Sequence, residues 1–400
     1  AEPVERVRAG WTSLLFFANL GLWLAFYAPI QILLPQQAEL LAGAGKELVF
    51  GIVTGVGAAV AVVANPLVGL LSDRTTSRFG RRHPWTVLGA VAGAVGLVVL
   101  ASAGNVVVMV LGWCLAQAGL NGMLAALLSA IPDRVPVAQR AKTGGFVGIS
   151  QMLGTVLGAV LVTELVTSLS GGYLACAAVV LVGAAGFVLF TRDTVLPKER
   201  TARTKLHLWV SPKQHPDFAR MWACHFMVNL GNALGTFYLL FFLADVVKRA
   251  DPEGSLLILM GMYGAALAVG ALLTGWLSDR SGRRKRYVQI AVVLMAGAAL
   301  VLVVLQTWLG GLIAAPLLGA GFGMYWAVAI ALLTQVLPAA ADRAKDLGVV
   351  NIASSLPQVI APLFASVVLG SLGGYPGLFA ASAVATLIAG YYVTRIRTVA

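Results

Sequence analysis

The stretch Gly69-Leu-Leu-Ser-Asp73-Arg74 recurs in the second half of the chain as Gly275-Trp-Leu-Ser-Asp279-Arg280. This repeated motif is the strongest indication of the fold. Each copy is followed within a few residues by Gly-Arg-Arg, at Gly80–Arg82 and at Gly282–Arg284. Both copies directly follow an apolar run and precede another. Repeats in the same register predict a duplicated protein whose two halves share one topology.

The composition is that of a membrane protein. Of the 400 residues, 59% are hydrophobic and only 11% are charged, whereas a soluble domain has about 25% charged residues. This excludes a soluble enzyme, a disordered chain and a disulfide-rich scaffold. Hydropathy predicts twelve membrane spans of roughly 20 residues or more, at about 11–34, 48–71, 85–103, 106–131, 143–168, 172–191, 217–244, 255–278, 287–307, 310–337, 347–370 and 375–394.

The basic residues predict how the chain is oriented. With a cytoplasmic N-terminus, all 28 Lys and Arg except Lys46, Lys248 and Arg249 fall on the cytoplasmic side. The positive-inside rule therefore predicts that both termini are cytoplasmic, in the cytoplasmic membrane of the cell. The net charge of +12 is then a topology signal and not a nucleic-acid-binding signal.

A polar stretch divides the chain in two. Residues 192–216 form the longest polar segment and predict a cytoplasmic central loop. Residues 1–191 would form an N-terminal six-helix bundle and residues 217–400 a C-terminal one. The expected fold is an all-α membrane protein with twelve transmembrane helices in two pseudo-symmetric bundles.

These motifs resemble those of the major facilitator superfamily, which carries a G-x-x-x-D-R/K-x-G-R-R/K loop between its second and third spans. The stretch Gly275–Arg284 matches almost position for position, and the first copy has four extra residues before Gly80. That longer form, with Pro84 and Trp85, is similar to the glycoside–pentoside–hexuronide and sucrose-transporter-like branch. Asp346–Gln358 is similar to the eleventh span of the same branch.

The duplicated loops are candidate gates. Asp73 and Asp279 each end an apolar run beside Arg clusters, and a carboxylate is stabilised near a helix N-terminus. We expect them to face helices that start near Thr143 and Leu347 in the opposite half and to act as latches that break as the cytoplasmic side opens. The alternative is that the Arg residues only anchor the topology. The candidate gating residues are Asp73, Arg74, Arg78, Arg81, Arg82, Asp279, Arg280, Arg283 and Arg284.

Polar and aromatic side chains recur at helical spacing inside several spans, which places them on single helix faces. The resemblance implies that the first, fourth, seventh and tenth spans line a central cavity. Amides beside aromatic rings suit an uncharged polyol or glycoside, although Asn and Gln also form interhelical hydrogen bonds. The candidate substrate-binding residues are Asn19, Trp23, Tyr27, Gln117, Asn121, His225, Asn229, Asn232, Tyr325, Trp326, Asn351 and Gln358.

Ion coupling depends on two titratable residues. Glu164 is the acidic residue that lies furthest inside a predicted span, and His225 is the histidine that lies inside a predicted span. Glu164 is the first candidate for proton coupling and His225 the second. The alternatives are that Glu164 is a solvated outer-rim residue and that His225 is a hydrogen-bonded packing residue.

Together these features predict a transporter and not an enzyme. The expected function is secondary active transport of a small polar solute, a sugar or glycoside, by alternating access, with proton symport as the candidate coupling. A proton-driven exporter of drugs or amphipathic natural products is the alternative. Expected partners are the substrate, a co-transported proton or cation and membrane lipids; neither a nucleic acid nor a cofactor or metal is expected, and the chain is expected to be a monomer.

Overall fold

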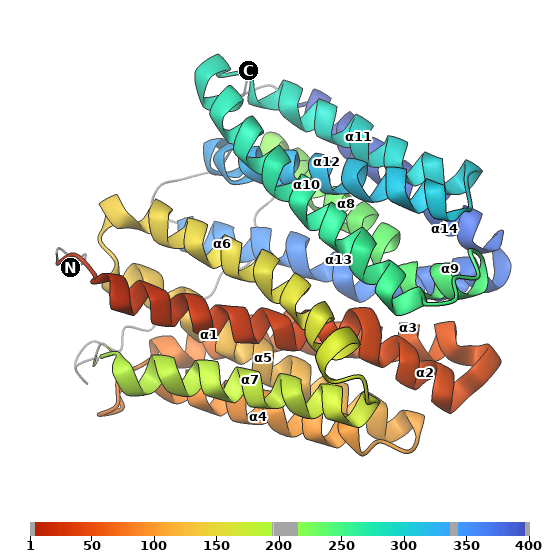
Figure 1. Cartoon of the computed structure of the whole chain (residues 1–400). Coiled ribbons are helices and arrows are strands. Elements are labelled where there is room, and N and C mark those ends of the chain that lie inside the picture. Colours follow the sequence, from red (N-terminus) through yellow and green to blue (C-terminus); the bar gives the residue numbers. More distant parts are fainter. Residues whose placement is uncertain (1–4, 194, 196–214, 337–342, 397–400) are drawn as a thin grey trace. The chain divides into compact units, whose positions relative to one another are not determined.

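The computed structural model describes residues 5–193, 195, 215–336 and 343–396. It divides into two compact units, Ala1–Thr204 and Lys205–Ala400. Each unit is built from helices, coloured red to yellow-green in the first and green to blue in the second (Figure 1). Most of the expected central loop, residues 192–216, lies outside the described residues.

The first unit opens with a continuous helical stretch from residue 9 to residue 73. At 1.5 Å per residue its 65 residues would extend about 98 Å, far more than the roughly 30 Å of a bilayer core. A short 3₁₀ turn, in which Gly43 has φ +52°, separates two crossings. The elements are α1 (Ala9–Ala28), the π-helical turn η1 (Pro29–Leu33), α2 (Leu34–Ala42), η2 (Gly43–Gly45) and α3 (Lys46–Asp73).

The π-helical turn in the first crossing follows from a proline. Pro29 has no N–H to donate and disturbs the regular hydrogen-bond ladder. The backbone N–H of Leu34 instead bonds to the carbonyl of Pro29, a five-residue step that lets the helix continue. The first crossing therefore runs without a break into α2.

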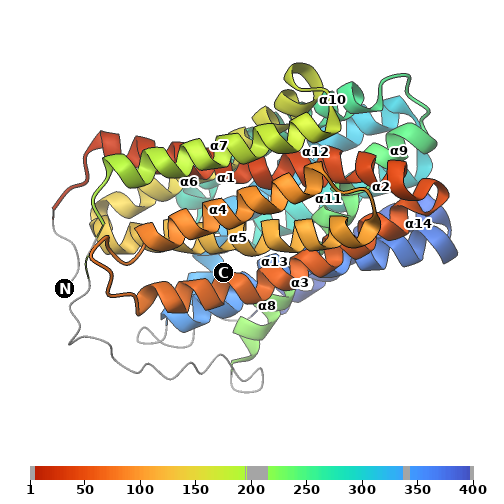
Figure 2. The same ribbon diagram turned by 90° about the horizontal axis from the view of Figure 1, so that it is seen from below.

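Four further crossings complete this unit. They are α4 (His83–Ala101), α5 (Val106–Arg134), α6 (Val137–Val160) with its π-helical end η3 (Leu161–Leu165), and α7 (Leu169–Phe190). In Figure 2, α4 lies between α5 and α7, and it packs against both.

The second unit contains the other six crossings. They are α8 (Pro216–Thr236) with its short continuation α9 (Leu239–Asp245), α10 (Pro252–Ser281), α11 (Arg284–Val304), α12 (Trp308–Val336), α13 (Arg343–Ser371) and α14 (Gly374–Thr394).

Helix packing inside the two units follows the same pattern. In the first unit α5 packs against α3 and α4, α1 against α6 and α7, and α4 against α7. In the second, α12 packs against α10 and α11, α8 against α13 and α14, and α11 against α14. Each pair in one unit has its counterpart in the other, which is the packing expected of duplicated bundles.

The predicted all-α fold with twelve spans is confirmed, although two helix starts differ from the expectation. Eleven stretches of the described chain are long and apolar enough to cross a membrane, and the first of them contains two crossings. However, α6 begins at Val137 and α13 at Arg343, several residues before Thr143 and Leu347. Hydropathy detects only the apolar part of a helix, so it misses a polar extension at the membrane edge.

Candidate substrate and gating sites

The first span carries a buried polar and aromatic face. Asn19 is fully buried, and its Nδ2 donates to the carbonyl of Leu15 at 2.8 Å. The Trp23 and Tyr27 rings stack with centroids 5.8 Å apart. Among the described residues, Asn19 Oδ1 and Trp23 Nε1 have no hydrogen-bond partner although both atoms are buried. The acceptor and the donor lie one helical turn apart on the same face of α1. Leaving two buried polar groups without hydrogen bonds is costly, so their presence requires an explanation.

Helix α6 holds this face in place. Gln151 Nε2 donates to the Tyr27 hydroxyl at 3.3 Å. A Cβ at Gly154 would lie 2.9 Å from the Cβ of Trp23, so the glycine lets α6 approach α1 closely. The Trp23 and Tyr27 rings are therefore held in position both by their own helix, α1, and by the neighbouring helix α6.

The fourth span places its two predicted amides in contact with each other. Asn121 Nδ2 donates to Gln117 Oε1 at 2.8 Å and to the Gln117 carbonyl at 2.9 Å. Gln117 is buried and Asn121 is half-buried. This pair satisfies part of its own hydrogen bonding, in contrast to Asn19 and Trp23.

In the second unit, His225 is the residue around which the predicted polar and aromatic side chains gather. Its Nδ1 lies 2.5 Å from the Tyr325 hydroxyl and its Nε2 lies 2.8 Å from Ser354 Oγ. The edge of the ring contacts Trp326, with centroids 5.4 Å apart. His225 is only 1% exposed. The three helices α8, α12 and α13 thus form one hydrogen-bonded chain through an imidazole.

The two asparagines further along α8 have separate partners. Asn229 Nδ2 donates to the His225 carbonyl at 2.7 Å, one helical turn back. Asn232 Oδ1 accepts a hydrogen bond from the Tyr263 hydroxyl of α10 at 3.0 Å. Three of the predicted residues, His225, Tyr325 and Trp326, meet directly, and the two asparagines continue the same helix.

Several predicted residues lie outside these clusters. Gln358 is exposed on α13, and the side chain of Asn351 lies outside the described part of the chain. Glu164 is exposed in η3, two residues before the crossing ends at Val166. Its position at a helix end favours the outer-rim interpretation over a buried proton relay.

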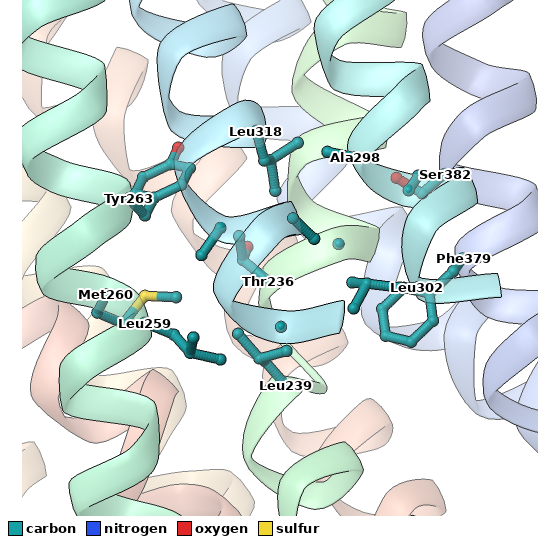
Figure 3. Close-up of a pocket in the computed structure, with 15 residues that line it drawn as sticks. Thr236, Leu239, Leu259, Met260, Tyr263, Ala298, Leu302, Leu318, Phe379 and Ser382 are labelled. Carbon is teal, nitrogen blue, oxygen red and sulfur yellow. The ribbon is translucent and has the colours of Figure 1, made fainter. Parts of the chain in front are cut away.

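A small cavity lies inside the second unit, beside the α8–α9 junction (Figure 3). Its volume is about 20 Å³, and a single water needs roughly 10–15 Å³ of such space. Of the polar groups that line it, Thr236 donates to the Asn232 carbonyl and Ser382 to the Gly231 carbonyl. The cavity is a packing gap in an apolar bundle and is too small for a sugar.

The first motif copy forms an ion-pair network at the ends of α3, α4 and α5. Arg82 Nε donates to Asp133 Oδ2 at 2.7 Å, and Arg81 binds the same carboxylate. Arg82 also bonds Ser72 and Asp73. Burial lowers the pKa of Arg82, but the hydrogen bonds and charges of Asp133 and Asp73 outweigh burial, and the net pKa is raised. The guanidinium therefore stays charged although it is only 3% exposed.

A second carboxylate caps α4. Asp193, just beyond α7, accepts hydrogen bonds from the backbone N–H groups of Arg82 at 2.5 Å and His83 at 2.8 Å. A helix N-terminus presents such unpaired N–H groups. Gly80, at φ +93°, leaves the space that Asp193 occupies, because a Cβ there would lie 2.2 Å from Oδ2 of Asp193.

The second motif copy is arranged differently. Arg280 lies over the Trp276 ring at 5.7 Å, and Arg283 is exposed. Lys285 Nζ donates to the Ile396 carbonyl at 2.8 Å, which ties α11 to the end of α14. Arg284 starts α11, and the Asp279 side chain lies outside the described part.

Sequence reasoning missed the residues that complete these sites: Asp133, Asp193, Gln151 and Tyr263. All four are far along the chain from their partners, so no local spacing connects them. The scarcity of acidic residues, 16 in the chain, is the signal that could have selected Asp133 and Asp193.

The family is shown by a match along most of the chain. The model of the family described as MFS/sugar transport protein matches residues 46–390. This chain belongs to that family. The predicted resemblance to the major facilitator superfamily is confirmed, and the protein is a multi-pass membrane transporter with a small-molecule substrate. No curated protein matches the chain.

Solved transporters share the fold at low sequence identity. A variant of the nucleoside transporter NupG has 12% identity and a TM-score of 0.76, covering 96% of this chain and 98% of that one. A POT family transporter in complex with 5-aminolevulinic acid has 12% identity and a TM-score of 0.78, covering 94% of each chain. A bacterial homologue of the human lysosomal transporter Spinster, inward-facing and unoccupied, has 15% identity and a TM-score of 0.70, covering 98% and 95%. At these sequence identities, the similarity shows only that this MFS transporter shares their fold.

Proposed function

We propose that this MFS transporter moves an uncharged sugar or glycoside across the cytoplasmic membrane by alternating access, with both termini in the cytoplasm. The observation that carries the proposal is the pair of unsatisfied buried groups on α1, Asn19 Oδ1 and Trp23 Nε1. A hydroxyl-rich solute supplies what both lack, because each hydroxyl donates and accepts.

The surroundings of these groups also favour a neutral sugar. The stacked rings of Trp23 and Tyr27 present an apolar face of the kind that packs on the C–H face of a pyranose. In the described helices, the acidic and basic residues lie towards the helix ends, so the middle of α1 offers no counter-charge for an ionic substrate. The description of the matching family, MFS/sugar transport protein, agrees with this substrate class.

We also propose that His225 couples transport to protons. Its imidazole bridges Tyr325 and Ser354, so a proton taken up at one ring nitrogen changes a hydrogen bond on α12 or α13. Such a change biases helices that pack against α8. Glu164, exposed at the end of its span, lacks comparable contacts and is the weaker candidate.

Gating is proposed for the duplicated loops. Asp73, Arg81 and Arg82 bind within their own unit, and a latch to the opposite half through Asp73 or Asp279 stays a proposal. Breaking such a latch would open the cytoplasmic side.

A thermal-shift screen of the purified full-length protein tests the substrate class. A ligand that binds only the folded state raises the melting temperature by mass action. We expect a neutral mono- or disaccharide to raise it and Asn19→Leu to abolish the shift. Stabilisation by hydrophobic drug-like compounds, with none by any sugar, would instead establish the exporter alternative.

A further inference from the structure

An open groove lies along α3, α4 and α5 in the halves nearest the loop 74–82, which the proposed orientation places on the cytoplasmic side, and it is separate from the candidate substrate residues. Its volume is about 270 Å³, and nearly all of its surface is apolar. The residues that line it are Val68, Trp85, Leu88, Gly89, Ala92, Ala118, Gly119 and Gly122.

Small residues create the groove. A Cβ at Gly119 would lie 2.2 Å from the backbone nitrogen of Gly93, so α4 and α5 touch backbone to backbone. This close approach leaves a floor of glycine and alanine between larger side chains such as Leu88, which is 56% exposed. From Trp85 to Ala92 the groove follows α4 for about 10 Å into the membrane.

The cytoplasmic mouth of the groove is positively charged. Trp85 Nε1 donates to Thr75 Oγ1 at 2.8 Å, which places the loop after α3 at the end of the groove. In that loop Arg74 and Arg78 are exposed and, among the described residues, have no carboxylate partner. Arg81 and Arg82, in contrast, are neutralised by Asp133 and Asp73.

We propose that this groove binds an anionic phospholipid, with one acyl chain between α3, α4 and α5 and the headgroup phosphate at Arg74 and Arg78. An acyl chain fits an apolar, laterally narrow groove that starts at the membrane edge. A phosphate is the group that guanidinium side chains bind with good geometry, and anionic lipids are attracted to basic residues at the cytoplasmic surface. The bound lipid would stabilise the end of α3 beside the Arg82 network.

Native mass spectrometry of the full-length protein tests the proposal, with phosphatidylglycerol and phosphatidylcholine added in equal amounts. We expect retention of phosphatidylglycerol over phosphatidylcholine. The variant Arg74→Gln/Arg78→Gln should lower the bound fraction by about tenfold or more. Ala118→Phe, which fills the groove, should also lower it strongly.

Two control variants match these changes. Arg280→Gln/Arg283→Gln removes the same charges from the second motif copy, and Val182→Phe adds a ring at an exposed position of α7. Both should retain phosphatidylglycerol like the unmodified protein. If Ala118→Phe fails to fold, Ala92→Leu narrows the same groove, and the arginine variant tests the headgroup contact without changing a helix.

Three results would overturn the proposal. They are equal retention of both lipids, phosphatidylglycerol retention that none of the groove and loop variants changes, and a dimer that Ala118→Phe dissociates. The last would show that a second copy of the chain occupies the groove.

Discussion

Arg82 Nε and Asp133 Oδ2 lie 2.7 Å apart and join the start of α4 to the end of α5. The two side chains are only 3% and 8% exposed, respectively. A buried charge of this kind is tolerated only while its partner stays in place, because an uncompensated buried ion is far costlier than an exposed one. The pair therefore fixes the end of the first unit at which α4 begins and α5 ends.

Asp133→Asn is expected to destabilise the protein strongly. The change leaves Arg81 and Arg82 without their shared carboxylate, and breaking a buried pair costs about 3–5 kcal/mol. The measurement is the thermal unfolding temperature in detergent. Glu164→Gln, the same kind of change at an exposed carboxylate, should leave that temperature unchanged. Equal effects of the two substitutions would contradict a structural role of the Arg82–Asp133 pair.

Gly80→Ala should destabilise the protein more than Gly282→Ala, the equivalent change in the second motif copy. Both glycines have positive φ, which costs an alanine roughly 1–2 kcal/mol. At Gly80 the new Cβ also displaces Asp193 from the N-terminus of α4, whereas at Gly282 nothing lies within 4 Å. Thermal unfolding of the two variants gives the comparison, and a smaller loss at Gly80 would mean that Asp193 does not cap α4.

Asn19→Leu should abolish transport without loss of stability. The substitution removes a buried acceptor that lacks a partner, and such a group costs about 1–3 kcal/mol in the folded state. Unfolding temperature and sugar uptake, measured together, separate binding from packing. As a control, Ser382→Ala removes a buried hydrogen bond of 2.7 Å to the Gly231 carbonyl and should lower stability while uptake persists. A destabilised Asn19→Leu protein would point to a packing role.

His225→Asn should remove the pH dependence of uptake. If His225 carries the coupled proton, uptake by the unmodified protein falls as the external pH rises, and the variant responds weakly. Uptake of labelled sugar into proteoliposomes with an imposed pH gradient provides the measurement. Glu164→Gln serves as the comparison and should keep the normal pH profile. The opposite outcome, with Glu164→Gln flat and His225→Asn normal, would move coupling to Glu164.

The spans and the duplication could be predicted from the sequence because both are properties of contiguous residues. An apolar run of the right length is a span wherever it packs, and the two Gly-x-x-x-Asp-Arg copies align without knowledge of the fold. Asn19, Trp23 and Tyr27 can be assigned to one helix face from the sequence because residues four apart lie on the same side of a helix.

The partners of these residues could not be predicted because they are fixed by tertiary packing. Asp133 is 51 residues from Arg82, and Ser354 is 129 residues from His225. Helix starts were misplaced for a related reason, since α6 extends beyond its apolar segment to Val137. Local pattern thus specifies the helices, and packing specifies which side chains meet.

Sugar counterflow tests the central claim most directly, because exchange of labelled for unlabelled substrate requires binding and alternating access but no coupling ion. Proteoliposomes are preloaded with an unlabelled neutral sugar that stabilises the protein, and accumulation of the labelled sugar is followed. We predict that the unmodified protein accumulates the labelled sugar and that Asn19→Leu does not. Trp23→Phe, which removes the indole N–H but keeps an aromatic ring, should reduce accumulation by about fivefold. Counterflow that both variants leave unchanged, or its absence for every neutral sugar while a hydrophobic compound exchanges, would contradict the account.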